Sequence, residues 1–253
     1  MNKEKKIVIF IPAYEHTKTL PSVLDRIPES VKKKVKEILV VDDASSDNTY
    51  LLAKGYGIEK GLKKLHVYRN RKNKGYGGNQ KVGYKYAIDR GYDIVAMLHG
   101  DGQYAPELLP KLLEPLENDR ADMVFGSRMR DSPLKGGMPL YKFLGNKLLT
   151  FIENLFLRMD LSEFHSGYRL YSCHALKKIP FELNSDDFHF DTDILIQFKE
   201  AGFKIVELPI PTYYGDEISY VNVLQYGLNV IKSVLEYKLH KWGVKKIDKF
   251  DIK

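Results

Sequence analysis

The stretch Asp93–Tyr104, DIVAMLHGDGQY, joins an apolar run to a polar turn that contains two glycines. The run Ile94–Leu98 has the length and the β-branched start that are typical of a buried strand. It ends at a turn in which Asp101 lies between the two glycines. Because ligands of open α/β sheets bind at the carboxyl ends of the strands, we expect Asp101 to face a ligand. Glycine lets the backbone approach a bulky polyanion, and a carboxylate can hold the divalent cation that neutralises it.

Apolar runs alternate with helical patterns on both sides of this stretch. Before it, we expect strands at Ile7–Ile11, Glu37–Val41 and Leu65–Tyr68, with helices at about 17–27, at about 45–54 and ending near 90. After it, we expect a helix at about 106–118 and a strand at Met123–Phe125. This alternation implies right-handed crossovers. The sequence therefore predicts an α/β fold of a nucleotide-binding type, with a mostly parallel central sheet flanked by helices.

The second half of the chain has a different character. Arg130–Pro139 is rich in glycine and proline and is the candidate mobile segment. Phe164–Tyr171 and Phe188–Asp193 mix polar and aromatic side chains, which is typical of loops that face a substrate. Lys204–Pro209 is predicted to be a further strand.

Two segments of this half carry an apolar stripe at helical spacing. One stripe consists of Leu140, Leu144, Leu148, Phe151 and Leu155. The other lies on a helix expected from about Val221 to Trp242 and consists of Leu224, Leu228, Ile231, Leu235 and Leu239, followed by a lysine-rich tail. Such stripes pack against a sheet or contact a membrane, and packing on the sheet is the favoured interpretation for both.

Composition limits the class of protein. The 253 residues are 43% hydrophobic and 29% charged, which suits one or two packed domains and argues against disorder. The single cysteine, Cys173, excludes an intramolecular disulfide and a cysteine-rich metal site, and it is expected to be a core residue in a reducing compartment. The net charge of +7 suits nucleic acid, an anionic membrane or phosphate-bearing substrates, but a solvated lysine-rich surface is the default explanation.

The N-terminal sequence and the hydropathy of the chain bear on its location in the cell. The N-terminal sequence MNKEKK runs into a strand without the apolar region of a signal peptide, and no apolar run reaches the roughly 18 residues of a membrane span. We expect a cytoplasmic protein that is soluble or peripheral at the inner face of the plasma membrane.

Carboxylates follow three of the predicted strands, as Glu15, the pair Asp42 and Asp43, and Asp101. In a parallel sheet these strand ends share one edge, so the carboxylates can converge. In the pair, one carboxylate can accept a hydrogen bond from a base or a ribose, while the other caps the following helix. For Asp43 the two roles are equally open.

The turn after the central strand offers ligands for a cation. Asp101 and Gln103 present two oxygen ligands that suit magnesium or manganese and leave sites for diphosphate oxygens. His99 is a third candidate metal ligand, a donor to phosphate, or an ordinary histidine at a strand end.

Two further features suit a phosphate. Asn73–Asn79, NKGYGGN, looks like a glycine-rich phosphate loop with Gly75 as a candidate nucleotide contact, although it lacks the spacing of a dinucleotide motif or a P-loop. Arg128, just past a strand end, can clamp a diphosphate, or it is a surface arginine.

The remaining catalytic candidates are His165–Arg169 and Asp191–Asp193. A carboxylate near an acceptor hydroxyl could act as a general base, whereas Asp191 could instead begin a helix. No GxSxG element for a serine hydrolase is present in the sequence.

The order of these segments is more specific than any one of them. IVIFIPAYEH, EILVVDDASSDNT, NKGYGGNQ, MLHGDGQY and FGSR together resemble the inverting glycosyltransferases of family 2, which have the GT-A fold and use nucleotide-diphosphate sugars. EFHSGYRLYS, FDTDILIQ and KIVELPIPTYY resemble the acceptor half of polyprenyl-phosphate sugar synthases, the dolichyl-phosphate mannose synthase group. The resemblance spans roughly nine-tenths of the chain.

The resemblance implies roles for individual residues. Those that would line the nucleoside pocket are Pro12, Ala13, Tyr14 and Glu15, with Asp42 on the base or ribose. Asp101, assisted by Gln103, would hold the metal, Arg128 the diphosphate, and Asp193 or, less closely matched, Asp191 would be the acceptor-side acid. His99 stands where the family has the first acid of its DxD motif, which should weaken magnesium binding and favour manganese.

We therefore expect an inverting hexosyltransferase, with a GT-A domain at 1–218 (a nucleotide-sugar half at 1–130 and an acceptor half at 131–218) and a C-terminal helical extension at 219–253. Its acceptor would be a polyprenyl phosphate or a glycan. The alternatives are a nucleotidyltransferase, although PAYEH lacks the glycine-rich basic signature after the first strand, and a sugar-nucleotide-binding protein without transferase activity. A nucleic-acid binder is disfavoured because the lysines are scattered and the aromatic residues lie largely in apolar patterns.

Overall fold

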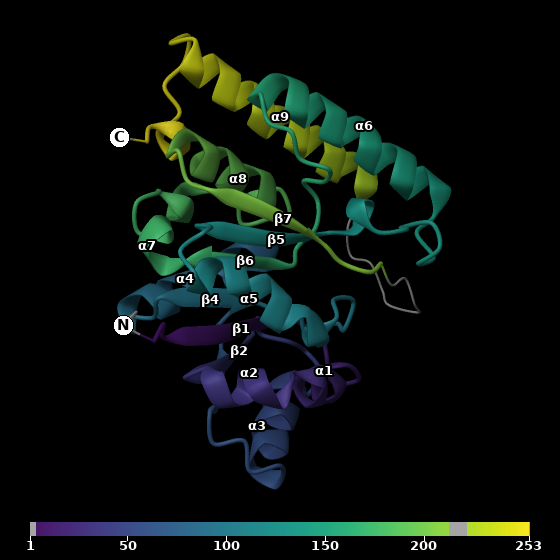
Figure 1. The fold of residues 1–253 in the computed structure, drawn as a ribbon, viewed down its shortest axis with the longest axis vertical. Helices are drawn as coiled ribbons and strands as arrows, with labels where there is room; N and C mark the ends of the chain where they lie inside the picture. The colour runs from purple at the N-terminus through teal and green to yellow at the C-terminus, as the bar shows by residue number, and fades with distance from the viewer. Residues whose placement is uncertain (1–3, 213–221, 253) are drawn as a thin grey trace.

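The computed structural model describes residues 4–212 and 222–252 and contains a seven-stranded sheet with the order β3-β2-β1-β4-β6-β5-β7 (Figure 1). β6 runs antiparallel to its neighbours β4 and β5, and the remaining strand pairs are parallel. The strands are β1 (Ile7–Ala13), β2 (Glu37–Asp42), β3 (Leu65–Arg69), β4 (Ile94–Met97), β5 (Met123–Ser127), β6 (Arg169–Ser172) and β7 (Ile205–Pro209). The predicted mostly parallel α/β sheet is confirmed.

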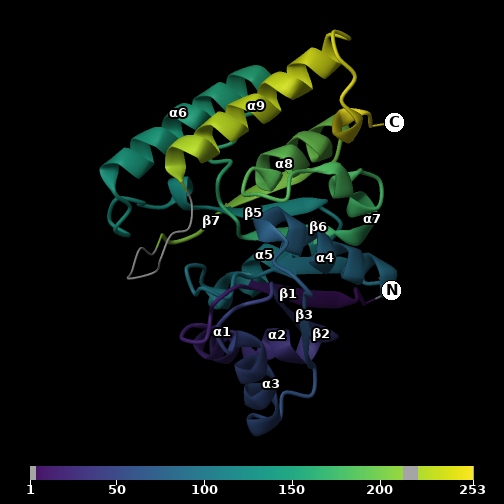
Figure 2. The same cartoon turned by 180° about the vertical axis from the view of Figure 1, so that it is seen from behind.

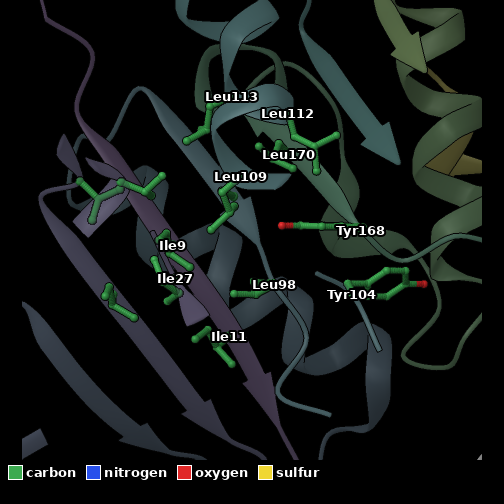
Figure 3. Close-up of a cluster of buried hydrophobic side chains, with 14 of the residues drawn as sticks. Ile9, Ile11, Ile27, Leu98, Tyr104, Leu109, Leu112, Leu113, Tyr168 and Leu170 are labelled. Atoms are coloured by element: carbon green, nitrogen blue, oxygen red, sulfur yellow. The ribbon is translucent and has the colours of Figure 1, made fainter. Parts of the chain in front are cut away.

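Helices lie on both faces of the sheet. They are α1 (Leu20–Arg26), α2 (Glu29–Lys34), α3 (Thr49–Glu59), α4 (Gly75–Asp89), α5 (Leu109–Glu117), α6 (Leu140–Leu157), α7 (Cys173–Leu176), α8 (Phe190–Glu200) and α9 (Val223–Lys241). Alternate residues of β1 point to opposite faces, so each face has its own apolar core. One core contains side chains of α1, α2, α3 and α5, part of which Figure 3 shows, and the other contains side chains of α4, α7, α8 and α9.

Three segments differ from the sequence prediction. β1 continues through Pro12 to Ala13 because these residues stay paired with β2. Its pairing with β4 ends at Phe10, so proline interrupts no ladder on that side. The predicted loop Phe164–Tyr171 supplies the start of β6, and the predicted loop Phe188–Asp193 supplies the first turn of α8. β6 inserts between β4 and β5, so the predicted acceptor half shares the sheet of the nucleotide half. The predicted boundary at 218/219 lies outside the described residues.

The prediction that both apolar stripes pack against the sheet is wrong. In both views α6 and α9 lie side by side, and α8 lies between α9 and the sheet (Figures 1 and 2). The five residues of the α6 stripe are between 56% and 65% exposed. α9 instead packs inward through Val230, Val234 and Tyr237. Within the described residues, no helix is long and apolar enough to cross a membrane.

Cys173 lies in the core, as predicted. Burial raises the pKa of its thiol to about 12, so the thiolate that a nucleophile requires does not form near neutral pH.

Candidate active site

A cavity of about 540 Å³ opens at the carboxyl edge of the sheet, within the usual size range of ligand pockets. It is lined by loops that follow β1, β4 and β5 and by side chains of α4, α6 and α9. The sequence-predicted site residues that line it include Pro12, Ala13, Tyr14, Asp43, Gly75, His99, Asp101, Gln103, Arg128, His165, Gly167 and Asp191. Glu15, Asp42 and Asp193 are not among its lining residues.

Asp42 supports the loop after β1 from behind. It is fully buried and its Oδ1 accepts a short hydrogen bond from the Ser45 hydroxyl. The same hydroxyl oxygen accepts the N–H of Glu15 at 2.9 Å, where the backbone has a φ of 58°. The side chain of Glu15 accepts a hydrogen bond from Ser46 Oγ at 2.6 Å. This geometry makes Asp42 and Glu15 parts of the loop scaffold, and the nucleoside contacts that the resemblance implies for them stay a prediction.

Asp43 caps α4, which is the second helix after it in the chain. It does not cap the next helix, α3. Its carboxylate accepts the backbone N–H groups of Lys74 at 2.9 Å and Gly75 at 3.0 Å, at the start of α4. It also accepts Nδ2 of Asn70 at 2.7 Å. A carboxylate at a helix N-terminus satisfies otherwise unpaired N–H groups and interacts favourably with the helix dipole.

The glycine-rich start of α4 provides close packing, where the sequence suggested a phosphate loop. The N–H groups of Gly77 and Gly78 donate to the carbonyl of Asp186. A Cβ atom at Gly77 would lie 2.3 Å from the carbonyl oxygen of Ser185, and Gly75 has a φ of 79°. The backbone donors that a phosphate cradle would offer are therefore engaged within the protein.

The turn after β4 presents a possible metal-binding group to the cavity. Asp101 Oδ1 accepts the N–H of Gln103 at 2.9 Å, which fixes the carboxylate, and Oδ2 lies 4.0 Å from His99 Nδ1. Nε2 of His99 is buried and forms no hydrogen bond within the described part of the chain. Burial lowers the pKa of the neighbouring His16, and the charge of Asp101 opposes this shift.

These donors fit a weakly held divalent cation. Within residues 4–212 and 222–252, no three His, Cys, Asp or Glu side chains form a group that could hold a metal. Magnesium-type sites often use one or two carboxylates together with phosphate oxygens of the substrate. One carboxylate beside an imidazole and an amide suits such a shared site, and the imidazole favours manganese over magnesium.

Arg128 lies in the cavity wall and is held by a buried acid. Its Nε donates to Glu163 Oε1 at 2.9 Å and its backbone N–H donates to Oε2 at 2.7 Å. Burial alone would raise the pKa of Glu163, but Arg128 and a hydrogen bond from Asn146 lower it below its ordinary value. The ion pair therefore fixes the guanidinium at the end of β5, where it can contact an anion.

Asp191 and Asp193 have separate roles. Both belong to the first turn of α8, as the helix-start interpretation of Asp191 anticipated. Asp191 lines the cavity and accepts hydrogen bonds from Tyr76 at 2.9 Å and Gln80 at 3.3 Å. Asp193 is fully buried and forms an ion pair with Lys249 at 2.9 Å. The geometry thus favours Asp191 over Asp193, the reverse of the preference that the resemblance gave.

Arg169 organises the segment His165–Arg169 from inside the protein. It is fully buried and donates to the carbonyls of Phe164 at 2.6 Å, Asp191 at 2.7 Å and Ser166 at 2.8 Å. Burial would lower its pKa, but the nearby carboxylate of Asp191 raises the pKa above the ordinary value of arginine. This cation therefore stays charged and ties the loop before β6 to the start of α8.

Several cavity residues were not found from the sequence. α6 contributes Lys142 and Asn146, and α9 contributes Tyr226. Tyr226 bonds His165 Nδ1 at 2.8 Å, and His165 Nε2 lies 3.2 Å from the buried Glu153 of α6. The available signal was the polar spacing of Lys142, Asn146, Thr150 and Glu153, which marks a second face of the α6 helix opposite its apolar stripe.

Comparisons with known proteins bear on the family and the fold of this chain. The family model described as glycosyl transferase family 2 matches residues 8–180. A UDP-N-acetylglucosamine–dolichyl-phosphate N-acetylglucosaminyltransferase from Methanococcus voltae is 32% identical over 223 residues, which cover 84% of this chain and 88% of the relative. An undecaprenyl-phosphate mannosyltransferase from Micrococcus luteus is 30% identical over 240 residues, which cover 88% of this chain and 94% of the relative.

Solved structures show the same fold at lower sequence identity. The structure of glucosyl-3-phosphoglycerate synthase from Mycobacterium tuberculosis, in complex with Mn²⁺, UDP and phosphoglyceric acid, matches with a TM-score of 0.70 and 20% identity. The match covers 92% of this chain and 78% of that chain and confirms the predicted GT-A fold. The family match over most of the sheet and the two relatives confirm the resemblance seen in the ordered motifs. This chain belongs to glycosyl transferase family 2.

Proposed function

We propose that this protein transfers a hexose, with inversion at the anomeric carbon, from a UDP- or GDP-sugar to a polyprenyl phosphate. In this proposal residues 1–130 bind the nucleotide sugar, residues 131–218 receive the acceptor, and residues 219–253 form a C-terminal helical extension. One relative is named for dolichyl phosphate and the other for undecaprenyl phosphate, and both are polyprenyl phosphates. These names support this choice of acceptor.

The observation that carries the proposal is the distribution of charge along the cavity. Asp101 enters it from the turn after β4, whereas Arg128 and Lys142 enter it from the end of β5 and from α6. Asp101, with His99 and Gln103 beside it, would hold a manganese or magnesium ion bound together with the donor diphosphate. The bound ion would neutralise charge that develops on the departing nucleoside diphosphate. Arg128 and Lys142 supply cationic donors suited to phosphate oxygens.

A lipid-phosphate acceptor also agrees with the surroundings of Asp191 and Asp193, the two candidate general bases. An acceptor phosphate is already an anion, so it attacks the anomeric carbon without a general base. Asp193 is buried against Lys249 and does not reach the cavity. Asp191 lines the cavity, where its hydrogen bonds from Tyr76 and Gln80 hold it in place. We assign Asp191 the role of an orienting carboxylate in the wall.

The segment Arg130–Pro139 has a place in this scheme. Its Met138 is buried and lines the cavity, and Gly136 packs against Thr212 so closely that a Cβ atom would lie 2.1 Å from the Thr212 carbonyl oxygen. We propose that the segment covers the bound donor and excludes water, which limits hydrolysis of the sugar nucleotide. Because a polyprenyl acceptor is embedded in lipid, the enzyme would act as a peripheral protein at the cytoplasmic face of the membrane.

A ligand panel tests the donor half of this proposal. UDP, GDP, CDP and dTDP are added separately, with and without manganese, and the unfolding temperature is measured. A ligand present at ~100 times its dissociation constant should stabilise the protein by roughly 2.7 kcal/mol. We expect UDP or GDP to raise the unfolding temperature, and to raise it further with manganese.

Variants make the panel specific. Asp101→Asn should remove the manganese increment, because it deletes the carboxylate charge and keeps the oxygen that accepts the Gln103 N–H. Asp89→Asn, at an exposed carboxylate of α4, is the matched control and should respond as the wild type does. The absence of a shift with all four diphosphates would contradict the assignment of the cavity to a nucleotide-sugar donor.

A further inference from the structure

Helix α6 has the reverse of the amphipathic arrangement that a surface helix of a globular protein normally shows. Its polar face points inward, where Glu153 and Thr150 are buried and Lys142 and Asn146 line the cavity. Its apolar face points outward, away from the core. The exposed apolar side chains of α6 are Leu140, Tyr141, Leu144, Leu148, Phe151 and Leu155, each at least 56% exposed. A water-facing helix normally places these two faces the other way round.

Helix α9 extends this apolar surface. Leu224, Leu228 and Leu235 are 83%, 64% and 48% exposed, and they recur on the face of α9 opposite its buried side. The two helices touch where Gly227 meets Leu149, since a Cβ atom at Gly227 would lie 3.7 Å from Leu149 Cδ1. Both views show the pair side by side on the same side of the molecule, remote from α3 (Figures 1 and 2). We call the exposed apolar side chains of α6 and α9 the outer surface.

The charges around the outer surface are mainly positive. Between residues 140 and 158 the single acidic side chain, Glu153, is buried, whereas Lys147 and Arg158 are exposed. Between residues 223 and 246 the sequence has five lysines and one acidic residue, Glu236. A helix pair with an apolar face flanked by lysines suits a membrane interface that carries anionic lipids.

The outer surface also adjoins the cavity. Lys142, Asn146 and Leu149 of α6 and Val223 and Tyr226 of α9 line the cavity, while neighbouring residues of the same helices form the outer surface. A lipid whose phosphate enters the cavity would therefore leave its hydrocarbon chain beside exposed leucines. A second copy of this chain could also cover apolar side chains, but it would not account for the lysines or for the nearby cavity.

We propose that the outer surface of α6 and α9 inserts into the interface of an anionic lipid bilayer and places the cavity over the membrane. The surface that meets the lipid follows from the exposed side chains and the flanking lysines. Its role in bringing a lipid acceptor to the cavity rests on the proposed function. Apolar patches of this extent on a monomeric protein usually mark a binding surface. Insertion places the leucines in the acyl boundary and leaves the flanking lysines among the lipid headgroups.

Vesicle binding tests the proposal without donor or acceptor. The full chain is sedimented with vesicles of phosphatidylcholine containing phosphatidylglycerol, and with vesicles of phosphatidylcholine alone. The test variant is L144Q/L148Q/F151Q, and the matched control is L51Q/I58Q, which removes exposed apolar side chains of α3 that are 63% and 84% exposed. We expect the wild type and the control to bind anionic vesicles and the test variant to bind at least ~100-fold more weakly.

The other outcomes are equally informative. Binding to anionic vesicles should weaken as salt rises, because the lysines contribute through screened charge. Equal binding of the test variant and the wild type would overturn the proposal, as would a wild-type dimer that the substitutions dissociate and that binds no vesicles. Both variants change exposed positions, so their unfolding temperatures should match the wild type. If vesicles bind but no nucleoside diphosphate does, the proposed function fails while the membrane surface stands.

Discussion

Replacing the buried Arg169 with methionine should destabilise the protein, because methionine keeps the apolar contacts of the side chain but loses its hydrogen bonds and its charge. The guanidinium donates to three backbone carbonyls, those of Phe164, Ser166 and Asp191, at 2.6 to 2.8 Å. It also lies 3.8 Å from the carboxylate of Asp191. A buried acceptor left without its donor costs ~1–3 kcal/mol, and removing one partner of a buried charged pair costs ~3–5 kcal/mol. We expect the free energy of unfolding to fall by at least ~3 kcal/mol, since the lost interactions overlap and do not simply add.

Urea unfolding followed by circular dichroism measures this loss. Arg169→Lys retains the positive charge but not the planar fork of donors, so its loss should be smaller than that of Arg169→Met. Arg71→Met, at an exposed arginine, is the control and should change the free energy of unfolding by no more than ~0.5 kcal/mol. A loss below ~1 kcal/mol for Arg169→Met would refute the view that this cation holds the loop before β6 against α8.

The remaining predictions concern packing, the buried acid and pH. Gly77→Ala should lower the free energy of unfolding by ~2 kcal/mol or more, because its Cβ atom would meet a backbone oxygen. Gly145→Ala, in open space on α6, should be neutral or stabilising. Similar losses at both positions in thermal or urea unfolding would contradict the packing role of Gly77. Asp193→Asn should lower stability and retain sugar transfer, because its carboxylate pairs with a lysine outside the cavity; loss of transfer in a folded variant would restore its role as the acceptor-side acid. Burial would raise the pKa of Glu200, but hydrogen bonds from two lysines and a tyrosine lower it to about 2. The contribution of Glu200 to the free energy of unfolding, at most ~1 kcal/mol at this partly exposed site, should therefore be complete above about pH 4.5 and lost as the pH falls toward 2. Glu200→Gln should flatten this part of the curve of stability against pH. An unchanged curve in the variant would contradict the assigned role of Glu200.

The sheet and its edge could be predicted because apolar runs of strand length are strong local signals. Ile7–Ile11 and Ile94–Leu98 are buried on both faces, so their sequences are almost uninterrupted apolar runs. The parallel order then brings Asp101 and Arg128 to one cavity although they are far apart in the chain. β6 escaped prediction because its four residues include Arg169, whose charge is satisfied inside the protein by backbone carbonyls and by the Asp191 carboxylate, contacts that a strand pattern does not contain.

The roles of polar side chains within the site depended on contacts that the sequence does not contain. Asp42 and Asp43 are adjacent, yet one braces the loop after β1 and the other caps α4. The glycines of α4 resemble a phosphate loop because close backbone packing and phosphate binding both require a missing side chain.

Periodicity found both amphipathic helices but not the direction in which their apolar faces point. A stripe such as Leu144 and Leu148 has the same spacing whether it meets a core, a partner or a lipid. In α6 the polar residues Lys142 and Glu153 turn inward to the cavity region, so the apolar stripe must turn outward. Recognising that inversion requires knowing that a cavity beneath the helix is lined by its polar residues Lys142 and Asn146.

The most direct test of the central claim is the product of the reaction. The purified protein is incubated with manganese, a polyprenyl phosphate in detergent and, in separate reactions, UDP-N-acetylglucosamine, UDP-glucose and GDP-mannose. The lipid product is isolated and its anomeric configuration is determined by proton NMR. We predict one glycosyl polyprenyl phosphate with the configuration opposite to that of the donor, and its absence with Asp101→Asn. Transfer with retained configuration, or wild-type transfer by Asp101→Asn, would contradict the account.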